Sequence, residues 1–180
     1  REEGHEYTVE HQAARFLILT NSDGATDFRL VETPCATPGR AHWTDVLPHE
    51  PGRLLLDVEA YADWLLWSER ENALPRIRWQ RVGEGTVRTF DVDEPAYSLS
   101  LEPLVEHGSD VVRIGHSSPT TPETVFGVAL ESGERTVLKR EEIPSGHDPA
   151  RYATARVHAT SADGSEVPVT LLHLATTALD

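Results

Sequence analysis

The 180-residue chain has no methionine and only one cysteine, Cys35. A single thiol cannot form an internal disulfide, so the fold must be held by a packed core, and a reducing, cytoplasmic location is expected. The opening residues 1–4 are charged or glycine and lack the apolar core of a secretory signal peptide. We therefore expect this chain to be an internal piece of a longer protein.

Long apolar runs and positive charge are also scarce. No run approaches the roughly 20 apolar residues that a membrane helix needs, which argues against a membrane partner. The formal net charge is −14, and a surface of that sign repels the phosphates of nucleic acid. With hydrophobic residues at 38% and charged residues at 26%, the composition is that of a folded domain with a solvated acidic surface. Attraction of a cationic peptide is a second interpretation of the same charge.

The sequence shows little helical periodicity. Instead, short apolar runs separated by Gly, Ser and Pro residues predict short strands joined by turns. One plan, an apolar run followed by a polar break and a second run, recurs around Thr20, Ser68 and Ser117, with spacings of 48 and 49 residues. A period near 50 with four strands in each unit is typical of β-propeller blades. The expected strands are 5–11, 15–21, 28–34 and 42–48 in the first unit, 53–60, 62–71, 75–82 and 86–92 in the second, and 96–102, 110–117, 124–130 and 135–143 in the third.

The predicted fold is therefore all-β. Residues 1–150 form a partial propeller of about three four-stranded antiparallel blades (about 5–48, 53–92 and 96–143) and a linker. In residues 151–180 the Asp163-Gly164 pair predicts a hairpin turn between strands 155–160 and 167–174. Only the stretch 54–67 also fits a helix, and there the repeat favours two strands that turn at residues 60–62.

Several segments carry a family resemblance. They are RIGHSSPTTPETVF (113–126), GERTVLKREEIPSG (133–146), HDPARY (147–152) and VHATSADGSEVPVTLL (157–172), supported by DEPAYS (93–98) and FRLVETP (28–34). Together they resemble the end of the propeller domain in the oligopeptidase B (protease II) group of the prolyl oligopeptidase family of serine peptidases. The chain departs from that pattern at His116, where an aromatic is usual, at Pro119, where an aliphatic is usual, and at His173-Leu174.

The resemblance implies a parent enzyme that hydrolyses short peptides after Arg or Lys by acyl transfer through Ser, His and Asp. The hairpin would begin its α/β-hydrolase domain, residues 144–151 would act as a hinge, and the propeller would admit substrates by size. The partners would be a short peptide substrate, the remaining blades and the catalytic domain. A partial propeller also leaves blade faces uncovered, so we expect self-association of this piece.

No catalytic residue is predicted within the chain. A hydrolase of this kind holds its nucleophile on a G-x-S-x-G turn between a strand and a helix. The nearest match, residues 115–119, has Pro119 in place of the closing glycine and no following helix. Ser117 is therefore interpreted as a strand residue, and the family's triad is expected beyond Asp180, which leaves this piece inactive.

Metal and cofactor sites are not predicted either. The histidine pairs His5/His11 and His42/His49, and His147-Asp148, lack the spacing of ligands on a common face, so scattered surface histidines are the favoured account. The acid pairs Asp57/Glu59 and Asp91/Asp93 share a strand face. They suit glycoside hydrolysis only with partners across a pore, and a solvated face is favoured. The tryptophans between strands, Trp64, Trp67 and Trp79, are expected to fill the core.

Two hypotheses about function remain. The favoured one is the non-catalytic propeller part of an oligopeptidase B-like serine peptidase. The alternative is a propeller segment that binds a protein or peptide without catalysis. A G-x-S-x-G motif followed by Asp and His in the parent protein would separate them.

Overall fold

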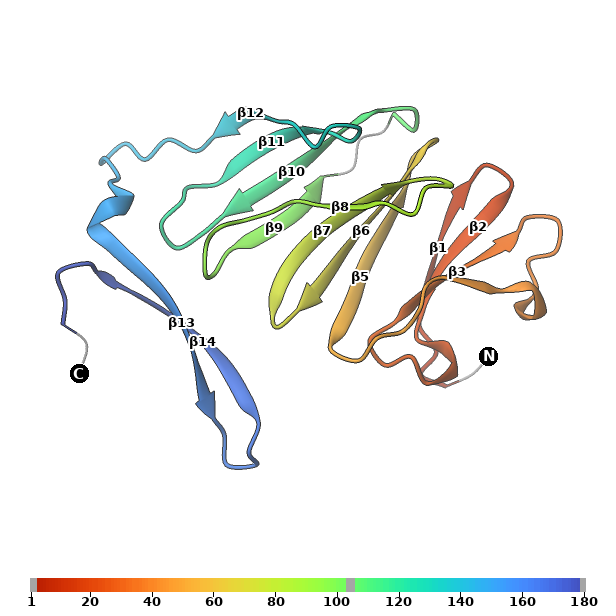
Figure 1. Cartoon of the computed structure of the whole chain (residues 1–180), viewed down its shortest axis with the longest axis horizontal. Helices are drawn as coiled ribbons and strands as arrows, with labels where there is room; N and C mark the ends of the chain where they lie inside the picture. Colours follow the sequence, from red (N-terminus) through yellow and green to blue (C-terminus); the bar gives the residue numbers. More distant parts are fainter. Residues whose placement is uncertain (1–2, 103–105, 179–180) are drawn as a thin grey trace.

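The computed structural model describes residues 3–102 and 106–178, whose regular structure is strand apart from three short 3-10 turns (Figure 1). Three four-stranded antiparallel sheets follow one another, each paired in chain order, and a separate two-stranded sheet follows them. Blade one contains β1 (Tyr7–Gln12), β2 (Arg15–Thr20), β3 (Arg29–Pro34) and β4 (Thr44–Leu47); blade two contains β5 (Arg53–Ala60), β6 (Trp64–Glu71), β7 (Leu74–Arg81) and β8 (Val87–Thr89); blade three contains β9 (Ser98–Glu102), β10 (Val111–Ser117), β11 (Thr124–Ala129) and β12 (Arg135–Arg140).

The hairpin consists of β13 (Tyr152–Thr160) and β14 (Glu166–Leu174), and three short 3-10 turns lie at η1 (Ser22–Gly24), η2 (Arg40–His42) and η3 (Pro149–Arg151). The sheets form an open fan, which confirms the predicted partial propeller (Figure 1). The stretch 54–67 is two strands, as the repeat predicted, and the N–H of Tyr61 closes their turn on the carbonyl of Trp64 at 2.9 Å.

Several boundaries differ from the expected ones. The last strand of blade one begins only at Thr44, because η2 occupies the residues before it. The last strand of blade two is three residues long and ends at Thr89. The hairpin begins earlier than predicted, at Tyr152, because η3 delivers the chain directly into β13. None of these shifts changes a pairing.

Apolar side chains fill the two spaces between blades. Successive residues of a strand point to opposite faces, so β6 sends Leu65 and Trp67 towards blade one and Trp64 and Leu66 towards blade three. The first cluster is Leu17, Leu19, Leu30, Leu47, Leu55, Val58, Leu65 and Trp67. The second is Tyr61, Trp64, Leu66, Ile77, Trp79, Phe90, Val112, Ile114, Val128 and Leu130. The prediction that these three tryptophans fill the core is confirmed.

Hydrogen bonds from buried side chains cross both spaces. Trp79 Nε1 donates to the carbonyl of Leu130 at 2.8 Å, which joins blade two to blade three. Gln12 Nε2 donates to the carbonyls of Tyr61 at 2.7 Å and Trp64 at 3.0 Å, which joins blade one to blade two. Because a buried polar group must find a partner, these bonds fix how one blade sits on the next.

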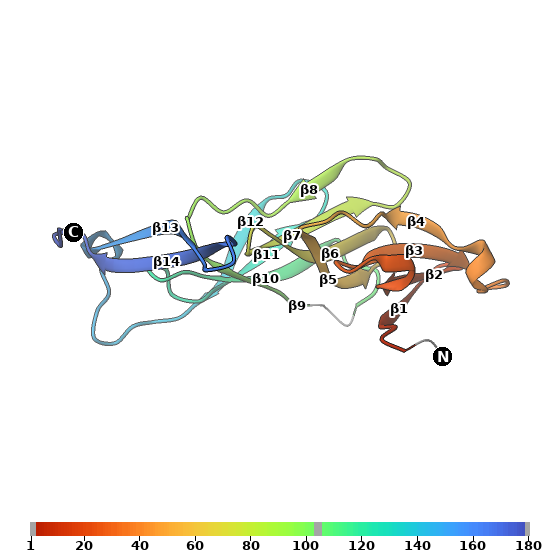
Figure 2. The ribbon, with the colours of Figure 1, turned by 90° about the horizontal axis from the view of Figure 1, so that it is seen from below.

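The first strands β1, β5 and β9 lie along one side of the fan, and the last strands β4, β8 and β12 lie along the other (Figure 2). No helix in residues 3–102 or 106–178 is long and apolar enough to cross a membrane.

Candidate functional site

In each blade the chain reverses between the second and third strands at the same end of the sheet. These reversals, residues 21–28, 72–73 and 118–123, are called the rim loops here. Figure 1 shows the hairpin β13–β14 on the side of the fan where the rim loops of blades two and three lie. The rim is therefore the surface on which blades two and three meet the following segment of chain.

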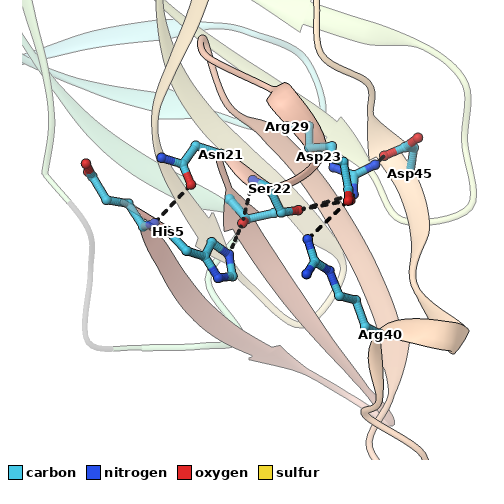
Figure 3. Close-up of polar contacts among 9 residues, drawn as sticks. His5, Asn21, Ser22, Asp23, Arg29, Arg40 and Asp45 are labelled. Atoms are coloured by element: carbon cyan, nitrogen blue, oxygen red, sulfur yellow. Dashed lines mark hydrogen bonds and ion pairs between the residues drawn. The ribbon is translucent and has the colours of Figure 1, made fainter. Parts of the chain in front are cut away.

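The rim loop of blade one is fixed by a network of charges (Figure 3). The Asp23 carboxylate accepts from both Arg29 and Arg40, the latter at 3.1 Å, and Arg29 also pairs with Asp45 at 3.3 Å. These pairs tie the loop to η2 and β4. Every carboxylate in this network faces a guanidinium, so its chemistry is that of a structural clamp.

The same loop is tied on its other side to the segment before β1. The Asn21 side chain accepts from the Glu6 N–H at 2.9 Å and donates to the Gly4 carbonyl at 3.0 Å. His5 Nε2 is 2.8 Å from Thr20 Oγ1, at the start of the loop (Figure 3). The loop is thus held from two directions, and its backbone is placed rigidly.

In blade two the rim loop is a two-residue turn. Asn72 and Ala73 both have positive φ, 51° and 58°, as a type I′ hairpin turn requires. The carbonyl of Asn72 accepts a hydrogen bond from the Arg156 guanidinium on β13, which joins blade two to the hairpin. Behind the turn the fully buried Glu69 pairs with Arg78 Nε at 3.0 Å.

In blade three the rim loop is fastened by a single carboxylate. Glu94 Oε2 lies 2.9 Å from Nε2 of the buried His116, and Glu94 Oε1 accepts from the hydroxyls of Ser118 and Thr121, the latter at 2.9 Å. We call Glu94, His116, Ser118 and Thr121 the Glu94 latch. The latch holds the carbonyl of Thr120, which His147 of the linker contacts through Nε2 at 2.8 Å.

The Glu94 latch contains the residue types of a hydrolase triad, but their order in space does not let the histidine take a proton from the serine. In a triad the histidine lies between the acid and the serine, so that the ring takes the hydroxyl proton. Here the carboxylate lies between His116 and Ser118. Ser117 is a strand residue paired with Ser98 on β9, which is the interpretation given to it above.

The other candidate residues are spread over the blades. Within the described ranges no three His, Cys, Asp or Glu side chains come together as metal ligands. Asp91 and Asp93 do not share a strand face as predicted, because β8 ends at Thr89 and both residues lie in the connection to β9, where the carbonyl of Asp91 accepts from Arg135 at 2.8 Å. Asp57 and Glu59 lie on β5, and burial raises the pKa of Glu59, with further contributions from Asp57 and from Glu10 of β1. The sequence did not reveal that Glu10, from the neighbouring blade, lies near enough to affect Glu59.

Three up-and-down sheets packed face to face, with a polar rim towards the next segment, define a β-propeller segment. Residues 1–141 match the family model for the N-terminal β-propeller domain of prolyl oligopeptidase. The chain therefore belongs to the prolyl oligopeptidase family, as its sequence resemblance indicated.

Named relatives agree with this assignment. Dipeptidyl aminopeptidase BI of Pseudoxanthomonas mexicana is 36% identical over 174 residues, which cover 96% of this chain and 24% of the relative. Protease 2 of Moraxella lacunata is 31% identical, covering 97% of this chain and 24% of the relative. The chain thus spans about a quarter of the length of these relatives.

Solved structures extend the likeness to the hairpin. Oligopeptidase B from Trypanosoma brucei, in a closed form with covalently bound antipain, superposes with a TM-score of 0.89 at 28% identity, covering 99% of this chain and 26% of that one. Oligopeptidase B from Leishmania major gives 0.87 at 25% identity, covering 97% of this chain and 26% of that one. The three blades and the hairpin therefore share the fold of this region in these peptidases.

The Glu94 latch makes a specific prediction about the linker. Glu94→Gln removes the charge that strengthens three hydrogen-bonded contacts, so backbone hydrogen exchange should become about tenfold faster in 118–123 and in 144–151. His147→Ala should accelerate exchange only in 144–151, because it breaks only the link to Thr120. Mass spectrometry of both variants, with Glu84→Gln on an exposed turn as control, measures this. Unchanged exchange in Glu94→Gln would show that the latch does not hold the linker.

The raised pKa of Glu59 predicts a pH-dependent stability. The folded state disfavours the ionised carboxylate, so the stability associated with this group is present below its ordinary pKa and is lost as pH rises through the raised value. Glu59→Gln should raise Tm by about 1–3 °C at pH 7 and have no effect near pH 4. Calorimetry at both pH values checks this, with Glu84→Gln as control. A lower Tm at pH 7 would contradict it.

Proposed function

We propose that this chain is the closing, non-catalytic part of the propeller of an oligopeptidase B-like serine peptidase, together with the first hairpin of its catalytic domain. The parent enzyme hydrolyses short peptides after Arg or Lys, and the propeller restricts substrates by size. The observation that carries the proposal is the match of residues 1–141 to the propeller family, with a fold shared by oligopeptidase B structures. The lone, half-buried Cys35 supports a cytoplasmic enzyme.

The division into domains belongs to the same proposal. Residues 1–150 comprise the three blades and the linker, and residues 151–180 begin the α/β-hydrolase domain. Two observations support this boundary. The family match ends at residue 141, and β13 and β14 form a sheet of their own. Residues 144–151 then act as a hinge, whose position depends on the contact between His147 and the rim loop of blade three.

The catalytic serine, histidine and aspartate of the parent lie outside this chain in our proposal. Self-association of the isolated chain, through the uncovered faces of blades one and three and the edges of the hairpin, stays a prediction. Large apolar side chains are exposed in these three places, among them Tyr7, Val9, Val137, Leu138, Val157, Val167 and Leu172.

The proposal is tested on the 180-residue chain and on the parent gene product in parallel. The chain alone should neither hydrolyse an Arg-ended chromogenic peptide nor be labelled by a serine-directed phosphonate. The parent should be labelled once and should cleave short peptides after Arg or Lys, while the same sites in a folded protein stay intact. Glu in place of Arg in the peptide serves as control. A parent that binds peptides without labelling would instead be a binding module.

A further inference from the structure

In the part of the chain that the structure describes, two side-chain hydrogen bonds join the linker and the hairpin to the blades. At the start of the hairpin, the His147 ring stacks on Tyr152 with ring centroids 6.2 Å apart, and His147 Nε2 lies 2.8 Å from the carbonyl of Thr120 on blade three. Further along β13, the Arg156 guanidinium donates to the carbonyl of Asn72 on blade two. The strands β13 and β14 pair only with each other and stand beside the fan (Figure 1). The position of the hairpin therefore depends on these side chains.

On blade two, the second contact is made by a turn that is held in place. Asn72 and Ala73 both have positive φ. Asparagine tolerates this conformation, whereas alanine adopts it at a cost, and such strained backbone persists only where its surroundings fix it. Here Glu71, the residue before the turn, pairs with Arg76 Nε at 2.9 Å and with Arg78 Nη2 at 3.6 Å. The turn therefore presents the Asn72 carbonyl in a fixed direction.

On the hairpin, the same contact is made by a charge without a counter-ion. Among the described residues Arg156 has no carboxylate partner, and its hydrogen-bond acceptor is the neutral carbonyl of Asn72. A charged donor makes a stronger hydrogen bond than a neutral one. Residues 153–156 of β13 are half-buried, whereas residues 157–160 are exposed. Arg156 is therefore the last point along β13 at which the hairpin is held.

The two contacts respond differently to a movement of the hairpin. His147 belongs to the linker, so its contact lies close to the point about which the hairpin can turn. Arg156 lies about 13 Å beyond Tyr152 along the strand, and a rotation about the linker displaces it by more. A hydrogen bond is lost once donor and acceptor are more than about 3.5 Å apart. The bond from Arg156 to the Asn72 carbonyl is therefore the one that breaks first.

We propose that Arg156 is a positioning residue, whose bond to the Asn72 carbonyl holds the hairpin, and with it the domain that the hairpin begins, close to blade two. Release of this bond lets the hairpin swing away about the linker. The inference rests on the proposed function, in which the hairpin begins the catalytic domain and the propeller restricts substrates by size. With the bond made, the opening beside blade two stays narrow; with the bond broken, longer peptides gain access.

The position of the hairpin is measured in the 180-residue chain by pulsed electron spin resonance. Nitroxides are attached at Ser165→Cys, in the hairpin turn, and at Glu84→Cys, on blade two, in a Cys35→Ser background, and dilution with unlabelled chain removes distances between copies. Arg156→Met keeps the length of the side chain and removes its donors, so the share of molecules with a displaced hairpin should rise about tenfold or more.

Two further variants separate the bond from other effects of the substitution. Arg156→Lys should return most molecules to the original distance, because a single carbonyl needs only one charged donor. Arg70→Met is the matched control, since Arg70 is exposed on β6 beside the same turn, and it should leave the distance unchanged. An unchanged distance in Arg156→Met would overturn the inference. Release of the hairpin by raised salt would also overturn it, because salt weakens an ion pair far more than a bond to a neutral carbonyl.

The parent enzyme gives a readout that a loss of stability does not move, namely the ratio of kcat/KM for a long Arg-containing peptide to that for a short one. Arg156→Met should raise this ratio about fivefold or more, and Arg156→Lys and Arg70→Met should change it less than twofold. An equal fall for both peptides would overturn the positioning role. A parent without peptidase activity, alongside release of the hairpin in Arg156→Met, would refute the proposed function alone. An active parent with no release in that variant would refute this inference alone.

Discussion

The structure depends on the burial of blade two on both of its faces. Trp64 and Trp67 lie three residues apart on one strand, and each is at least 98% buried, yet they belong to different apolar clusters. A tryptophan buries roughly 200 Å², worth about 5 kcal/mol in transfer free energy. The two rings are both buried only when a neighbouring sheet covers each face of blade two. Stacking of sheets, rather than any one sheet, is therefore what makes this segment fold.

Because the faces between neighbouring blades are taken up by packing, the polar contacts of the segment gather at the strand ends. At the ends, charged and polar side chains clamp the rim loops, and two of these loops contact the linker and the hairpin. These contacts tie blades two and three to the linker and the hairpin.

The repeat made the blades predictable, because strand alternation and turn residues are local properties. Thr20 and Ser117 end the second strands of blades one and three, while Ser68 lies inside the second strand of blade two, and all twelve blade strands occur near their expected positions. The contacts between distant segments were not predictable in this way. Glu94 meets Ser118 across 24 residues and Glu10 affects Glu59 across a blade interface, so only the stacked geometry brings them together. The sequence placed Asp57 and Glu59 on one strand face, but it gave no sign of Glu10 in the neighbouring blade.

The most direct test of this account is whether the three sheets unfold as one unit. Trp79→Phe removes the N–H that satisfies the buried carbonyl of Leu130 and should cost about 2–4 kcal/mol. Native-state hydrogen exchange of this variant should show an equal loss of protection in β2, β6 and β10. A loss confined to β10 and β11, with β2 as protected as before, would show that the blades fold independently and would contradict the central claim.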